Sequence, residues 1–188
     1  LLLCPGTPFK YAPRHDEILP GIARRLGRCR IIFFTYEQGH LSEKLRRRLE
    51  AAFARGGLEF DDFVSFIPWL NKEQFYGLLQ RADVYLDTIG FSGFNTALQA
   101  VECGLPIVTR EGRFLRGRLA SGILKRIGLP ELVTTSEQEY VGLAARLARD
   151  AKYRKVISDR IMASRHVLFE EAAPIHALEA FLIEVASA

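Results

Sequence analysis

Residues 84–109 read VYLDTIGFSGFNTALQAVECGLPIVT and form a complete strand–loop–helix–strand pattern. Val84–Asp87 and Pro106–Thr109 are short runs rich in the branched and aromatic residues that favour strands. Between them, the small and polar residues Ser92–Thr96 open a helix that runs to Glu102. Strands that alternate with helices pair in parallel within one sheet, so this stretch predicts an α/β domain.

The rest of the chain repeats this alternation. Four further apolar runs have the length of strands, and an amphipathic pattern predicts a helix at Leu41–Arg55. The four runs are Leu1–Cys4, Arg30–Tyr36, Phe63–Ile67 and Leu132–Thr134. Because several of them are almost continuously apolar, we expect strands that are covered on both faces. The sequence therefore predicts a Rossmann-like, doubly wound parallel sheet with right-handed crossovers.

Helix starts and the C-terminal region define the expected domain organisation. Asn71 followed by Gln74, and Ser136 followed by Glu139, have the spacing of capping boxes at helix N-termini. After Asp150 only helical patterns remain. We therefore predict a Rossmann-like lobe at residues 1–150 and a helical tail at residues 151–188 that packs on the same domain.

Composition excludes several functional classes. The 188 residues are 48% hydrophobic and 26% charged, and their net charge of +4 comes from basic residues scattered over helical segments. A nucleic-acid-binding protein would instead cluster its basic residues, so we expect no nucleic-acid partner. No apolar run reaches the roughly 18 residues of a membrane span. Three cysteines without paired spacing fit a reducing cytoplasm, and four isolated histidines predict neither a metal site nor a bound cofactor.

Ligands of doubly wound sheets bind where strands run into helix N-termini at the carboxyl edge. The loop at Ser92–Thr96 offers backbone N–H groups and a positive helix end to a phosphate, although an ordinary N-cap explains it equally well. The loop after the first strand carries three prolines and Lys10, a cation that could reach the same phosphate or lie in solvent. The chain has neither a Walker A motif nor GxGxxG, which disfavours P-loop hydrolases and NAD-dependent dehydrogenases.

The segment SGFNTALQAVECGLPIVT at residues 92–109 resembles the donor-binding motif of GT-B glycosyltransferases. A wider region resembles the O-linked N-acetylglucosaminyltransferase family and the related bacterial protein N-glucosyltransferases. The matching segments are FIPWLNKEQFYGLLQRADVYLDT (Phe66–Thr88), the motif itself and RLASGILKRIGLPEL (Arg118–Leu132). The order and spacing of these segments make the resemblance more specific than any single motif.

This resemblance implies a UDP-sugar-binding lobe. The family transfers a sugar from a UDP donor to a protein side chain, without a bound metal, between two Rossmann-like lobes. The chain is similar to the second lobe, so the implied ligand is UDP-GlcNAc or UDP-glucose and the implied acceptor is a protein. We expect the first lobe, and possibly helical repeats, to precede Leu1, and we expect the isolated chain to bind UDP weakly and to transfer nothing.

The resemblance also implies roles for individual residues. Lys10 matches a lysine that contacts the donor diphosphate and is needed for transfer, which makes it the implied catalytic residue. Implied donor contacts fall on both sides of the expected nucleotide: Thr7 beside the diphosphate, Trp69, Leu70 and Lys72 at the uracil, Asn95 and Thr96 at the phosphates, Gln99 at the ribose, and Gln38 and Arg118 elsewhere near the donor. Trp69 could equally lie in the core, and Gln38 could equally be a solvent-exposed loop residue.

Three substitutions keep a second hypothesis open. Phe75 and Phe94 stand where the O-linked transferases have histidines, and Gln99 stands where many relatives carry an acid. A non-catalytic nucleotide-binding or interaction module with a degenerate transferase site would explain these changes. Lys10 argues for retained transferase chemistry, because a degenerate site has no need of it.

Overall fold

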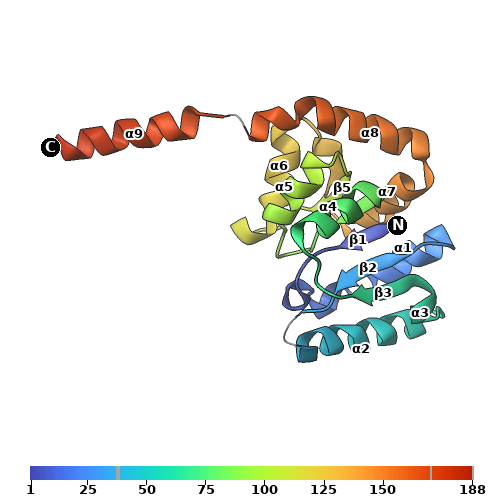
Figure 1. Cartoon of the computed structure of the whole chain (residues 1–188). Coiled ribbons are helices and arrows are strands. Elements are labelled where there is room, and N and C mark those ends of the chain that lie inside the picture. The colour runs from blue at the N-terminus through green and yellow to red at the C-terminus, as the bar shows by residue number, and fades with distance from the viewer. Residues whose placement is uncertain (37–38, 170, 188) are drawn as a thin grey trace.

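A computed structural model describes residues 1–36, 39–169 and 171–187 of the chain. These ranges contain a six-stranded sheet with the strand order β3-β2-β1-β4-β5-β6, shown in Figure 1. All five strand pairings are parallel. The strands are β1 (Leu2–Cys4), β2 (Ile31–Phe34), β3 (Val64–Ile67), β4 (Val84–Leu86), β5 (Ile107–Arg110) and β6 (Val133–Thr134). The predicted Rossmann-like parallel sheet is confirmed, and each strand lies within or next to a predicted run.

The strand order places a topological switch at the centre of the sheet. From β1 the chain builds outward through β2 to β3, and then crosses back to form β4 on the other side of β1. Leu2 in β1 pairs with Ile31 on one side and Val84 on the other. Loops that leave β1 and β4 therefore diverge from adjacent strand ends, which is the position where ligands bind in such sheets.

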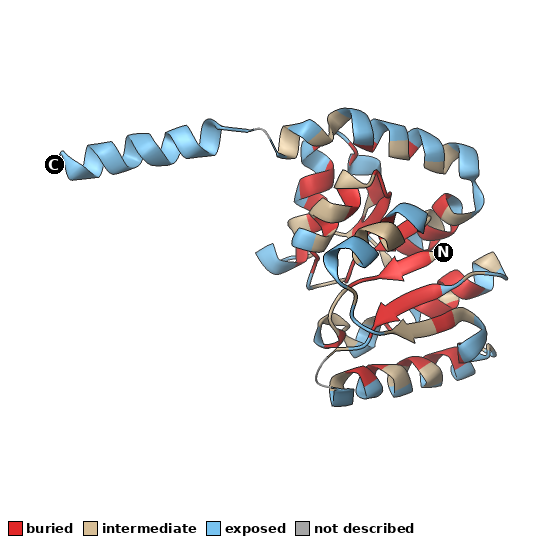
Figure 2. Ribbon diagram, viewed as in Figure 1, coloured by how far each residue is buried: buried red, intermediate tan, exposed pale blue. Residues whose placement is uncertain are grey.

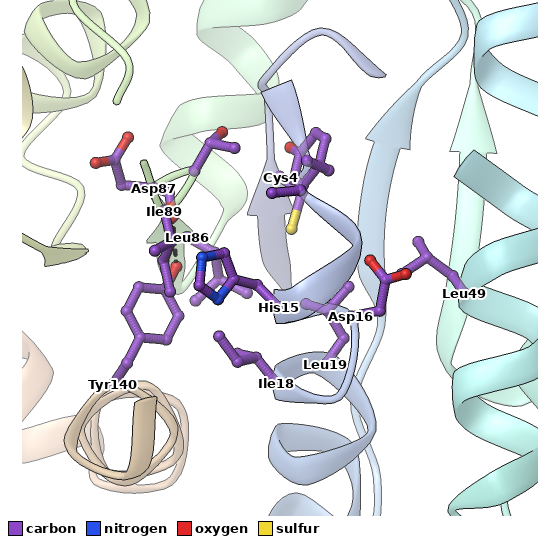
Figure 3. Close-up of a pocket in the computed structure, with 13 residues that line it drawn as sticks. Cys4, His15, Asp16, Ile18, Leu19, Leu49, Leu86, Asp87, Ile89 and Tyr140 are labelled. Carbon is purple, nitrogen blue, oxygen red and sulfur yellow. Dashed lines mark hydrogen bonds between the residues drawn. The ribbon is translucent and has the colours of Figure 1, made fainter. Parts of the chain in front are cut away.

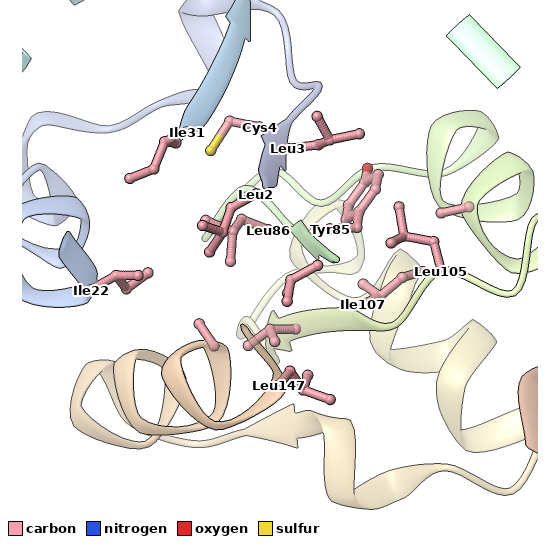
Figure 4. Close-up of a cluster of buried hydrophobic side chains, with 14 of the residues drawn as sticks. Leu2, Leu3, Cys4, Ile22, Ile31, Tyr85, Leu86, Leu105, Ile107 and Leu147 are labelled. Carbon is pink, nitrogen blue, oxygen red and sulfur yellow. The ribbon is translucent and has the colours of Figure 1, made fainter. Parts of the chain in front are cut away.

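Helices cover both faces of the sheet. One face carries α1 (Ile18–Leu26), α2 (Gly39–Arg55) and α7 (Glu137–Arg149), and the other carries α4 (Lys72–Arg81), α5 (Asn95–Glu102) and α6 (Leu119–Arg126). Leu2, Ile22 and Leu147, from β1, α1 and α7, belong to the same core cluster, which Figure 4 shows, and all three are completely buried. Burial of such residues supplies most of the driving force for folding, at about 25 cal/mol per Å² of apolar surface.

Several short helical segments connect or follow these elements. They are α3 (Phe60–Phe63) and the 3₁₀ helices η1 (Pro8–Lys10), η2 (Pro13–His15), η3 (Leu115–Gly117), η4 (Pro130–Leu132) and η5 (Arg165–Leu168). The expected capping box at α4 is present: Asn71 accepts a hydrogen bond from the Gln74 amide (2.9 Å), and the Gln74 side chain accepts one from the Asn71 amide (3.2 Å). At α7 only half of the expected capping box forms. The Ser136 hydroxyl accepts a hydrogen bond from the Glu139 backbone N–H (3.1 Å), but the Glu139 carboxylate accepts one from the backbone N–H of Thr135 instead of Ser136 (2.8 Å).

Two of the helices that cover the sheet, α1 and α6, were not predicted from the sequence. In α1, Pro20 interrupts the apolar pattern, but it lies in the first turn, where a residue needs no N–H for an intrahelical bond. The helix is therefore compatible with the proline, and it buries Ile18, Leu19, Ile22 and Ala23.

The C-terminal tail divides into two differently packed helices. In α8 (Ala151–Ser164), Ile157 and Ile161 are buried, and the helix contacts α5 and α7. In α9 (Ala173–Ala186) no residue is buried, and Figures 1 and 2 show it projecting away from the domain. The expected packing of the whole tail on the domain is therefore wrong for α9. Across the described ranges, none of the helices combines the length and the apolarity needed to cross a bilayer.

Candidate functional site

A cavity of about 240 Å³ opens at the carboxyl edge of the sheet. Its lining comes from the loop after β1, the end of β2, the loop after β3, and the first turns of α4 and α5. The lining residues are Pro5, Phe34, Trp69, Leu70, Asn71, Lys72, Phe75, Thr96 and Gln99. Segments that are distant in sequence thus form one concave site at the edge where doubly wound sheets bind their ligands.

One side of the cavity is an aromatic wall made of Phe34, Trp69 and Phe75. The Phe34 ring lies edge-on to Trp69 and to Phe75, with centroids 6.0 Å and 5.8 Å apart. Phe34 is buried at the end of β2, whereas Trp69 is 60% exposed. The alternative that Trp69 is a core residue is excluded by this exposure. An exposed indole on a fixed aromatic base offers a flat surface on which a planar heterocycle can stack.

The N-terminal end of α5 forms another part of the cavity lining. Its N-cap Phe94 makes no side-chain capping bond, in contrast to the capped helices α4, α7 and α8. The first backbone bond of the helix joins the Leu98 amide to the Phe94 carbonyl (2.9 Å). The N–H groups of Asn95 to Ala97 therefore have no intrahelical partner, and they give this end of the helix a partial positive charge. Such an end is suited to an anionic group.

The side chain of Thr96 is held against the sheet. Its hydroxyl lies 2.8 Å from the Tyr85 hydroxyl, and Tyr85 is buried on β4. Asn95, one residue earlier, is exposed at the start of α5. Gln99 lies one turn after Thr96 and lines the same cavity, so its amide can hydrogen-bond a ligand there.

Lys10 lies on η1, in the loop that follows β1. Its ammonium group is 4.7 Å from the centre of the Phe91 ring, which belongs to the loop between β4 and α5. Burial lowers the pKa of Lys10, and the negative charge of Asp87 partly opposes this effect. The contact between Lys10 and Phe91 bridges the loops from the two strands that flank the topological switch.

The loop before Lys10 is tightly constrained and holds an unpaired polar atom. The Gly6 amide donates to the Tyr11 hydroxyl (3.1 Å). A side chain at Gly6 would bring a Cβ within 2.4 Å of the Thr88 hydroxyl, so the loop needs a glycine here. The buried Thr7 hydroxyl oxygen has no hydrogen-bond partner within the described part of the chain. Buried hydroxyls are normally paired, so this oxygen has unused hydrogen-bonding capacity.

The cavity brings together five of the predicted donor contacts: Trp69, Leu70, Lys72, Thr96 and Gln99. Of the others, Thr7, Lys10 and Asn95 lie on the loops and the helix start described above, outside the cavity lining. Arg118 also lies outside it and pairs with Glu111 (3.3 Å), which also binds Lys125 (2.8 Å). Gln38 lies outside the described residues.

Sequence reasoning missed two features of the site. Phe34 reads as a buried strand residue, and nothing in its local pattern signals that the end of β2 also lines a cavity. Asp87 reads as the polar end of a strand, although its carboxylate is the centre of a buried hydrogen-bond network. For Phe75, the sequence indicated only that it replaces a histidine of the family, and the structure places it in the aromatic wall.

A second cavity of about 40 Å³ lies on the other face of the sheet, beside α1 and α7. Figure 3 shows His15, Asp87 and Tyr140 around it, with Cys4 at the end of β1. Its volume suffices for ordered water but not for a nucleotide. Across the described residues, no group of three or more His, Cys, Asp and Glu side chains is arranged to hold a metal ion.

Comparisons with known proteins agree with the observed fold. The model of glycosyl transferase family 41 matches residues 46–174. A UDP-N-acetylglucosamine–peptide N-acetylglucosaminyltransferase of Caenorhabditis elegans is 34% identical over 113 residues, which are 59% of this chain and 10% of that protein. The chain thus spans about a tenth of the length of this curated relative.

Solved structures show the same fold. An O-GlcNAc transferase of Thermobaculum terrenum superimposes with a TM-score of 0.76 at 24% identity, covering 90% of this chain and 34% of that one. The Anabaena protein HepE, in complex with UDP, superimposes with a TM-score of 0.65 at 15% identity, covering 95% of this chain and 48% of that one. Because the family model matches more than half of its residues, this chain belongs to glycosyl transferase family 41.

Proposed function

We propose that the cavity binds the UDP part of a UDP-sugar and that the chain is the donor-binding lobe of a protein glycosyltransferase. The observation that carries this proposal is the convergence of Trp69, Leu70, Lys72, Thr96 and Gln99 on one cavity beside the uncapped start of α5. The names of its relatives support it, since the Caenorhabditis elegans protein is a UDP-N-acetylglucosamine–peptide transferase and HepE was solved with UDP.

The nucleotide is expected to lie across the cavity with its two ends on unlike surfaces. The uracil stacks against Trp69 on the aromatic wall, and the ribose hydroxyls hydrogen-bond the Gln99 amide. The diphosphate faces the N-terminal end of α5, where the N–H groups of Asn95 and Thr96 lie. The unpaired Thr7 hydroxyl supplies a further hydrogen bond to the diphosphate.

Lys10 is the proposed catalytic residue of this lobe. Transfer of the sugar leaves an additional negative charge on the departing UDP, and a lysine near the diphosphate stabilises that charge in the transition state. We propose that Lys10 and the end of α5 supply this positive charge and that the reaction uses no metal or other cofactor.

The sugar and the acceptor complete the proposal. The donor is UDP-GlcNAc or UDP-glucose, and the acceptor is a protein side chain that a second lobe of the whole protein presents to the sugar. The 188-residue chain by itself binds UDP and does not transfer the sugar. Its cysteines Cys4, Cys29 and Cys103 are free thiols, which supports a place in the reducing cytoplasm.

Calorimetric titration with UDP, UMP and uridine tests this function. Wild-type protein should bind UDP more tightly than UMP, and Lys10→Ala should lose about 1.5–3 kcal/mol of UDP binding, as expected for a charge-assisted contact, with uridine affinity unchanged. Lys152→Ala, which removes an exposed lysine from α8, is the matched control and should bind like wild type.

Two results would count against the proposal. Absence of UDP binding at millimolar concentration in the whole protein would contradict donor binding and favour a degenerate module. Sugar transfer by the 188-residue chain alone would contradict the need for a second lobe.

A further inference from the structure

A buried carboxylate lies directly behind the start of α5. Asp87 follows β4, and its side chain is 4% exposed. One carboxylate oxygen accepts hydrogen bonds from the Ser92 and Thr109 hydroxyls, both at 2.6 Å, and the other accepts from the Gly93 amide at 2.7 Å. The acid does not line the cavity, so it acts on a ligand there through the residues that it binds and through the field of its charge.

The network reaches beyond the residues that contact Asp87. The Ser92 hydroxyl accepts a hydrogen bond from the Ala120 amide of α6 (2.9 Å), and the Ser92 amide donates to the Arg116 carbonyl (2.7 Å). The Asp87 carbonyl accepts from the Tyr140 hydroxyl of α7 (2.8 Å). One residue thereby ties β4 to β5, α6, α7 and the loop that enters α5.

The contacts of Gly93 show how closely this loop is fitted. A Cβ at Gly93 would lie 2.4 Å from the Tyr85 hydroxyl and 2.9 Å from the Thr96 hydroxyl. The loop therefore approaches β4 as closely as a glycine permits, and the Asp87 carboxylate accepts a hydrogen bond from the Gly93 backbone N–H. We call the loop 88–94 together with the first turn of α5 the α5 entrance. Its conformation decides where the free N–H groups of the helix point.

The charge of Asp87 is suited to this task. A carboxylate accepts at both oxygens, and an asparagine of the same shape accepts at one and donates at the other. Burial raises the pKa of Asp87, and the hydrogen bonds from Ser92, Thr109 and Gly93 lower it. The same negative charge acts on Lys10, where it favours the protonated ammonium against the effect of burial.

We propose that Asp87 is a positioning residue that fixes the α5 entrance for the donor diphosphate. This inference rests on the proposed function, because it concerns the same site. The aromatic wall is built from β2, the loop after β3 and α4, and the hydrogen bonds of Asp87 do not reach it. Loss of the carboxylate should therefore affect the recognition of phosphate and leave the recognition of uridine unchanged.

Asp87→Asn is the discriminating variant, because it keeps the shape of the side chain and removes its charge. We expect its dissociation constant for UDP to rise about tenfold, as for the loss of a charged hydrogen-bond acceptor, and that for uridine to stay unchanged. Thr134→Val is the matched control: it removes a buried hydroxyl that donates to the backbone carbonyl of Thr109 (3.0 Å) and makes no hydrogen bond to the Asp87 carboxylate. This control should bind both ligands like wild type.

Amide hydrogen exchange, followed by NMR, provides a readout that needs no ligand. In Asp87→Asn, exchange at Gly93 and Ala120 should accelerate more than exchange in the core strands, and more than it does in Thr134→Val. If Asp87→Asn weakens UDP and uridine binding equally, the proposal is overturned. It is also overturned if this variant keeps both its UDP affinity and its exchange rate at Gly93. If wild type binds no UDP, the proposed function fails, and the exchange at Gly93 and Ala120 still decides whether Asp87 fixes the α5 entrance.

Discussion

The aromatic wall and the α5 entrance face the same cavity and are constructed in opposite ways. The wall consists of rings that touch edge-on, and its outermost member, Trp69, is mostly exposed to solvent. The α5 entrance is held from behind by a buried carboxylate, two hydroxyls and a glycine that admits no side chain. A planar base tolerates small shifts of a stacking surface, whereas phosphate oxygens need donors at fixed positions, so for the proposed UDP ligand the more tightly held part is the one that would meet the phosphates.

The largest effect is expected from Gly93→Ala at the α5 entrance. The added Cβ would lie 2.4 Å from the Tyr85 hydroxyl, so the backbone or the buried tyrosine must move. We expect a loss of about 1–3 kcal/mol of unfolding free energy, typical of overpacked cores, together with loss of UDP binding. Chemical denaturation and calorimetry measure the two quantities.

Gly122→Ala is the control for this substitution. Gly122 lies within α6, and a Cβ there would meet no atom within 4 Å. Alanine at this position should stabilise the helix by about 0.5–1 kcal/mol. A Gly93→Ala protein as stable as wild type, with full UDP affinity, would show that the α5 entrance is not tightly fitted.

A change in the aromatic wall should separate binding from stability. Trp69→Ala should cost about 1–3 kcal/mol of affinity for both UDP and uridine, the range measured for stacking of bases on aromatic side chains. Because Trp69 is 60% exposed, its loss should leave the free energy of unfolding nearly unchanged. Phe114→Ala, at a phenylalanine that is 58% exposed and lies outside the cavity lining, is the matched control for removing an exposed ring. Unchanged uridine affinity in Trp69→Ala would place the base elsewhere.

The smallest expected effect is a pH dependence of UDP affinity, which arises from Lys10 on the phosphate side of the site. Burial lowers the pKa of Lys10 below its ordinary value of 10.5, so the lysine loses its proton at a lower pH than an exposed one. UDP affinity should therefore fall more steeply than uridine affinity as the pH rises into the alkaline range. In Lys10→Arg, whose guanidinium stays charged, this additional fall should be absent.

The same pKa shift has the opposite effect on the free energy of unfolding. In this alkaline range the unfolded chain holds the Lys10 proton more tightly than the folded one, so the contribution of Lys10 to the unfolding free energy rises with pH. If UDP affinity and unfolding free energy change with pH in the same way in wild type and in Lys10→Arg, the lowered pKa of Lys10 is contradicted.

Much of the fold was predictable because its signals are local. Runs such as Val84–Asp87 are apolar on both faces, and the Asn71–Gln74 pair identifies the start of α4 within a few residues. The helix α1 was missed because Pro20 breaks a pattern that the first turn of a helix tolerates. In α9 the apolar residues were visible in the sequence, but periodicity does not say what covers them.

The site was predictable only where the family motifs reach. Trp69 and Thr96 came from the resemblance, and the spacing of residues left Trp69 equally suited to the core. The Asp87 network joins residues up to 53 positions apart in the chain, so no local window contains it. Phe34 enters the cavity because β2 ends beside the loop after β3, and this register is fixed by strand pairing rather than by neighbours in sequence.

The isolation of α9 has a consequence for its own helix–coil equilibrium. A segment of 14 residues is close to the length at which an unsupported helix is only marginally stable in water. More than half of the surface of each large apolar residue in α9 is exposed, so little burial energy offsets the entropy lost on ordering; these residues are Ile175, Leu178, Phe181, Leu182, Ile183 and Val185. The helicity of α9 is therefore governed by local propensity. Binding of any surface that covers these side chains should raise this helicity, and circular dichroism or amide exchange would measure the increase.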